Sequence, residues 1–98
     1  MSANKIRIEG LKREIDYIKK AILMNKNSLD AKKKDTVRVK ERYKSSMSRA
    51  DSKQKATLRI SKTRELDHLK KEMDAIKKQV ADKKGQIAKK RLEISKLK

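Results

Sequence analysis

The sequence predicts an all-α fold, a two-helix antiparallel coiled-coil hairpin, and three observations lead to this expectation. A block consisting of an apolar residue, Asp and a Lys pair begins at Ile15, Leu29, Leu66 and Met73, and its copies lie a multiple of seven residues apart within each half of the chain. This spacing is typical of a coiled-coil heptad, whose apolar positions are named a and d. The heptad frames of the two halves do not join, and the apolar residues of one half match those of the other in reverse order.

The first helix is expected over about residues 3–47 and the second over about residues 55–97, in a single domain covering residues 1–98. In an antiparallel pair each a residue stacks on a d residue of the other helix, so facing residue numbers must add to one constant value. The pairs Ile8 with Leu97 and Leu11 with Ile94 share such a value, which holds along both arms. The apolar seam between the helices is expected to contain Ile8, Leu11, Ile15, Ile18, Ile22, Leu29, Val39, Leu66, Leu69, Met73, Ile76, Val80, Ile87, Ile94 and Leu97.

The turn is expected at about residues 48–54, inside a Ser-rich stretch. Steps of seven from Tyr43 reach Arg64, two residues short of Leu66, so the register breaks between the two halves. Asp51 followed by Gln54 has the spacing of a helix capping box, although Ser48 followed by Asp51 competes as the start signal.

A single long helix in a parallel coiled-coil dimer is the alternative architecture, and the absence of Gly and Pro from the middle of the chain favours it. The seam also contains polar layers, since Asn25, Lys32, Lys83 and Lys90 occupy d positions. Two interpretations stay open: these residues fix register and orientation, or the hairpin opens or docks a further helix along them.

The composition argues against an enzyme. With 45% charged and 2% aromatic residues the chain cannot build a thick core, so a partner or a second copy is expected. There is no Cys and no Gly-rich phosphate loop, and His68 is the sole His, so no catalytic residue, metal site, cofactor or small-molecule substrate is expected. The longest apolar run, Ala21–Met24, is too short for a signal peptide or a membrane span, which predicts a cytoplasmic or intraparticle protein, associated with a nucleoid or a virion.

The net charge of +18 points to a polyanionic partner. Residues 32–64 contain thirteen basic and three acidic residues, and a hairpin gathers them in its turn-proximal half. Lys outnumbers Arg by 23 to 8, which favours sequence-tolerant contact with DNA or RNA phosphates. The expected polyanion-binding residues are Lys33, Lys34, Lys40, Lys44, Arg49, Lys53, Lys55, Arg59, Lys62 and Arg64.

Two other interpretations of this charge are possible. The chain can be a structural or assembly protein, such as a helical stalk, an adaptor or a virion component, that docks on an acidic protein surface. It can also be a helical protein whose charges are simply solvated. A membrane-surface role is not expected, because the seam is narrow and lacks Phe and Trp.

Overall fold

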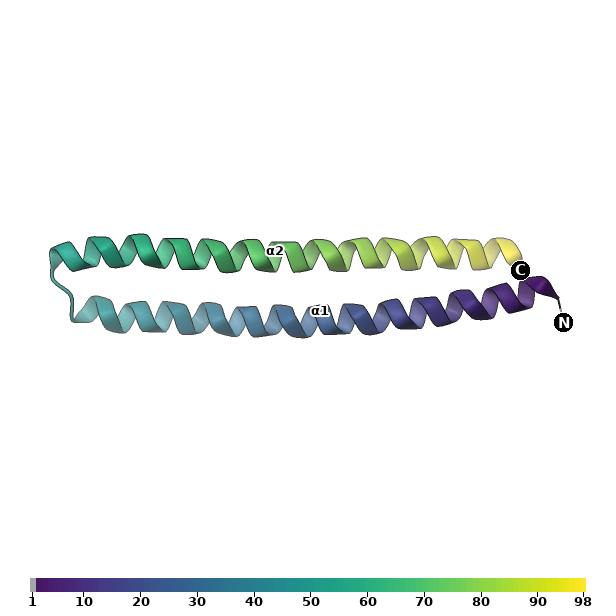
Figure 1. Cartoon of the computed structure of the whole chain (residues 1–98), viewed down its shortest axis with the longest axis horizontal. Coiled ribbons are helices and arrows are strands. Elements are labelled where there is room, and N and C mark those ends of the chain that lie inside the picture. Colours follow the sequence, from purple (N-terminus) through teal and green to yellow (C-terminus); the bar gives the residue numbers. More distant parts are fainter. Residues whose placement is uncertain (1) are drawn as a thin grey trace. The chain divides into compact units, whose positions relative to one another are not determined.

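The chain folds into two helices, α1 (Ala3–Ser48) and α2 (Ser52–Leu97), and residues 2–98 of this computed structural model are described (Figure 1). No strand occurs among those residues. The structure confirms the all-α helical hairpin, because the chain leaves the helical path at 49–51 and α2 then packs against α1. The continuous helix of the alternative architecture is therefore not formed.

The first helix ends in a tightened turn. The backbone amides of Arg49 and Ala50 donate to the carbonyls of Ser46 and Met47, at 3.2 and 3.3 Å, in the i→i+3 pattern that often closes a helix. The Ser48 hydroxyl donates to the Ser45 carbonyl at 2.7 Å, so this side chain belongs to the end of α1. No described non-glycine residue has a positive φ angle, so the reversal needs no left-handed residue.

A reciprocal capping box starts the second helix. The Gln54 amide donates to Asp51 Oδ1 at 2.8 Å, and the Asp51 amide donates to Gln54 Oε1 at 3.1 Å. These two bonds satisfy amides that a helix start otherwise leaves without a partner. α2 consequently begins at Ser52, three residues before the position expected from the heptad frame.

The helices contribute to two compact units, and each unit pairs a segment of α1 with an antiparallel segment of α2. We call the first the terminal unit; it comprises the described residues up to Asn27 together with Lys77–Lys98. The second, which we call the turn unit, comprises Ser28–Ile76.

The terminal unit has the better-formed apolar core. Leu11 is fully buried, and Ile15, Ile22, Ile87 and Ile94 form one buried cluster with it. Partly buried residues pack against this cluster from both helices: Ile8, Ile18, Val80 and Leu97. In the turn unit Tyr43 is the buried residue, while the expected seam residues are half-buried: Leu29, Val39, Leu66, Leu69, Met73 and Ile76.

The polar residues of the seam find partners inside the hairpin. Lys83 Nζ donates to Asn25 Oδ1 at 2.5 Å and Lys90 Nζ donates to Glu14 Oε2 at 2.8 Å. In the turn unit Lys32 Nζ lies 2.5 Å from a carboxylate oxygen of Glu72. The three lysines are half-buried, so each stem lies along the seam while its ammonium group reaches a polar partner at the edge.

Candidate polyanion-binding surface

All ten residues expected to bind a polyanion lie in the turn unit, on both helices and at the turn. Lys55 and Lys62 are half-buried and the other eight are exposed. Within the described part of the chain, none of the ten side chains takes part in an ion pair or a side-chain hydrogen bond. The ion pairs of the turn unit use other cations: Lys32 with Glu72, Arg38 with Asp35, and Arg42 with Glu65.

The Arg42–Glu65 pair marks a boundary in the distribution of charge. Residues 43–64, between these two partners in sequence, contain seven basic residues and one acid, Asp51. The Asp51 carboxylate is already used in the cap of α2, where it accepts the Gln54 amide. The basic residues on this segment therefore outnumber its single carboxylate by seven to one.

Tyr43 and Arg42 form a compact group with Glu65 at this boundary. The Arg42 guanidinium lies over the Tyr43 ring, 5.1 Å from its centroid, which is within cation–π range. Hydrogen bonding from Tyr43, and then from Arg42, lowers the pKa of Glu65, and the hydrogen bond to Glu65 raises the pKa of Arg42. Arg42 is therefore engaged within the hairpin and is less available to a ligand than its exposed neighbours.

Charge counted over the folded units differs from charge counted along the sequence. The turn unit contains fifteen basic and eight acidic residues, a net +7, whereas the terminal unit contains sixteen and five, a net +11. The basic stretch 32–64 is partly offset because α2 brings acids into the same unit: Glu65, Asp67, Glu72 and Asp74. Sequence reasoning missed the excess in the terminal unit because its two segments lie at opposite ends of the chain; counting charge over facing segments would have found it.

The described residues hold no group of three His, Cys, Asp or Glu side chains that could bind a metal ion. His68 Nε2 lies 2.8 Å from Glu72 Oε1, one helical turn away. In the part of the chain that the structure describes, neither helix has a segment long and apolar enough to cross a bilayer. Comparisons with protein-family models, with curated proteins and with solved structures gave no match.

Proposed function

We propose that this protein is a non-enzymatic polyanion-binding protein, which contacts the phosphate backbone of DNA or RNA through the turn unit and works within a larger assembly. The observation that carries the proposal is the segment 43–64, with seven basic residues, one acid and no ion pair among its cations. A nucleic-acid backbone supplies the counter-charge that this segment lacks, and binding releases the condensed counterions of the nucleic acid.

The side chains of the turn unit favour contact with phosphates over contact with bases. Tyr43, its one aromatic residue apart from His68, is buried against the seam and covered by Arg42, so it offers no face on which a base could stack. Lys carries most of the charge, and an ammonium group binds phosphate as a point charge, without the planar fork of donors that a guanidinium group presents. The expected binding is therefore sequence-tolerant and strongly dependent on salt.

Four substitutions in α2 test this proposal: Lys53→Gln, Lys55→Gln, Arg59→Gln and Lys62→Gln. The matched control replaces three Lys and one Arg on exposed positions of the terminal unit with Gln: Arg13, Lys20, Lys78 and Lys89. Both variants lose the same charge, and Gln is a good helix former, so both should fold.

Fluorescence anisotropy with duplex DNA over a range of salt concentrations gives the number of phosphate contacts from the slope of log affinity against log salt. Each lost contact reduces this slope by about 0.9 for duplex DNA, so the α2 variant should lose up to about 3.6 and the control much less. A slope that is unchanged in the α2 variant would contradict nucleic-acid binding at the turn.

The net +11 of the terminal unit favours a second candidate function, that of a structural or assembly protein docking on an acidic protein surface. Fluorescence anisotropy with an acidic polypeptide, measured on the same variants, distinguishes nucleic-acid binding from docking on an acidic protein. Under this second function the α2 variant should keep its affinity for the acidic polypeptide, because its four substitutions lie outside the terminal unit.

A further inference from the structure

The two sides of the seam in the terminal unit differ in their chemistry. In an antiparallel coiled coil the residues after the d positions, named e, flank one side of the seam, and the residues before the a positions, named g, flank the other. In the terminal unit every e position of the two helices is basic and exposed: Lys5, Lys12, Lys19, Lys26, Lys77, Lys84, Arg91 and Lys98. The g positions hold a mixed set: Arg7, Glu14, Ala21, Gln79, Gln86 and Glu93.

Three polar contacts between α1 and α2 in this unit involve a residue of the g side. Arg7 pairs with Glu93 at 2.8 Å, both at g positions, and the g residue Glu14 accepts from Lys90. The g residue Gln79 likewise accepts from Asn25 Nδ2 at 3.0 Å. None of the eight e residues takes part in an ion pair within the described chain. The g side is thus bridged by polar contacts between the helices, although a groove of about 430 Å³ also opens there, whereas the e side presents only like charges.

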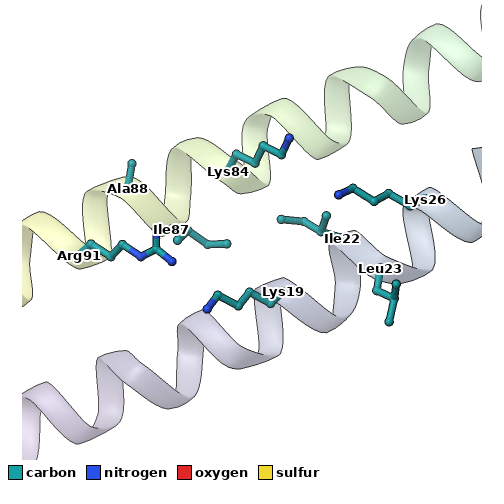
Figure 2. Close-up of a pocket in the computed structure, with 8 residues that line it drawn as sticks. All are labelled: Lys19, Ile22, Leu23, Lys26, Lys84, Ile87, Ala88 and Arg91. Atoms are coloured by element: carbon teal, nitrogen blue, oxygen red, sulfur yellow. The ribbon is translucent and has the colours of Figure 1, made fainter.

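The e side contains an open groove of about 540 Å³, in which an apolar strip lies between cations. Figure 2 shows Ile22 on α1 and Ile87 on α2 directed into the space between the helices, with basic side chains extending around them. Ile22 and Ile87 are 8% and 7% exposed, so they form the floor of the groove, and most of the exposed apolar surface among the lining residues belongs to Leu23 at its rim, which is 59% exposed. The remaining lining residues are Ala88 and four cations, with no acid: Lys19, Lys26, Lys84 and Arg91.

We propose that this groove binds an acidic amphipathic helix of a partner protein, which lies along the e side as a third helix beside α1 and α2. The apolar stripe of that helix would cover Ile22, Leu23 and Ile87, and its flanking Asp and Glu residues would pair with cations of both helices. Helices bind grooves in this way when apolar anchors recur every three or four residues. The proposal rests on the second candidate function, docking on an acidic protein, for which it names the site and the kind of partner, and it is independent of phosphate binding at the turn.

The charge and the exposed apolar surface of the groove favour an acidic helix over a second copy of the chain and over a nucleic acid. A second copy of the chain would bring another net +18 and its own basic e positions, so like charges would oppose it. A nucleic-acid backbone would match the cations but would leave the exposed Leu23 side chain uncovered. An acidic helix with an apolar stripe satisfies both features of the groove.

The test uses the full chain and a synthetic peptide of about four heptads, with Leu at its a and d positions, Glu at e and g, and Ala or Gln elsewhere. The groove variant carries Lys19→Gln, Lys26→Gln, Lys84→Gln and Arg91→Gln, and the control is the exposed set already described, Arg13, Lys20, Lys78 and Lys89 to Gln. Each set removes three Lys and one Arg. A second peptide has the same composition in a scrambled order without an apolar stripe.

Anisotropy should show that the groove variant binds the striped peptide about tenfold more weakly than the parent, since four exposed charge pairs are lost. The control should stay within about twofold of the parent, and the scrambled peptide should bind the parent much more weakly than the striped one. Equal losses in both variants, or equal binding of both peptides, would show attraction by net charge alone and overturn the proposal. If the groove variant lost affinity for duplex DNA while the control kept it, the groove would be assigned to nucleic acid instead. The α2 variant tests phosphate binding at the turn separately, so the two results can be distinguished.

Discussion

Replacement of Leu11 by Ala should destabilise the hairpin more than any equivalent change outside the seam, because Leu11 is the one fully buried large side chain among the described residues. The substitution removes three carbon atoms, worth about 2.4 kcal/mol at about 0.8 kcal/mol each, and leaves a cavity. The two helices can move together and partly fill that cavity, so the expected decrease in the free energy of unfolding is about 3 kcal/mol. For a chain of this length such a loss lowers the melting temperature by roughly 12 to 24 °C.

Urea and thermal unfolding followed by far-ultraviolet circular dichroism would measure this effect. Leu92→Ala is the matched control, because Leu92 also lies in the terminal unit but is 58% exposed. Its expected cost is below about 1 kcal/mol, since most of its surface already contacts water. Similar losses for the two variants would refute the assignment of Leu11 to the seam and, with it, the packing of the terminal unit.

Acid should weaken the hairpin through carboxylates that are hydrogen-bonded by seam lysines, which lower the pKa of Glu14 and of Glu72 from the ordinary value of 4.5. Because the pKa is lower in the folded state, this stabilisation is present above about pH 4.5 and is lost as the pH falls through the folded pKa. The double variant Glu14→Gln, Glu72→Gln should therefore show a smaller decrease of the urea midpoint between neutral and acidic pH than the parent. An equal decrease in both proteins would assign the acid sensitivity to other groups. In the seam, Asn25→Leu together with Lys83→Leu should raise the urea midpoint, because the pair replaces a half-buried polar contact with apolar packing. A lowered midpoint for this double variant would indicate that the polar layer stabilises the fold, and analytical ultracentrifugation would show whether its loss also changes the oligomeric state.

The heptad pattern was sufficient to predict the helical hairpin, because apolar period and reversed order are both properties of the sequence alone. Tyr43 and Leu66, the residues on either side of the register break, are buried and half-buried respectively. The start of α2 was less accurate. The heptad frame locates the seam but not the helix end. The capping box expected at Asp51 and Gln54 is confirmed, and it starts the helix at Ser52 and not at about residue 55.

The groove of the terminal unit could have been predicted but was not. In the sequence, the groove is indicated by a basic residue after each d position, as at Lys19 and Lys84. An analysis restricted to the a and d positions does not consider these residues. The partners of the seam lysines were not predicted. The constant sum of facing residue numbers places Lys90 close to Glu14 in height, but it does not say toward which side of the seam the flexible lysine side chain turns. The expected residues at the turn stay a prediction, since their role depends on a ligand.

The chain has no Trp, and its two tyrosines differ in environment: Tyr17 is 76% exposed in the terminal unit, while Tyr43 is 8% exposed in the turn unit. A Tyr17→Leu variant would therefore leave Tyr43 as the sole source of phenol fluorescence. Its emission would report only on the neighbourhood of Arg42 and Glu65, so that unfolding of the turn unit could be followed without any attached dye.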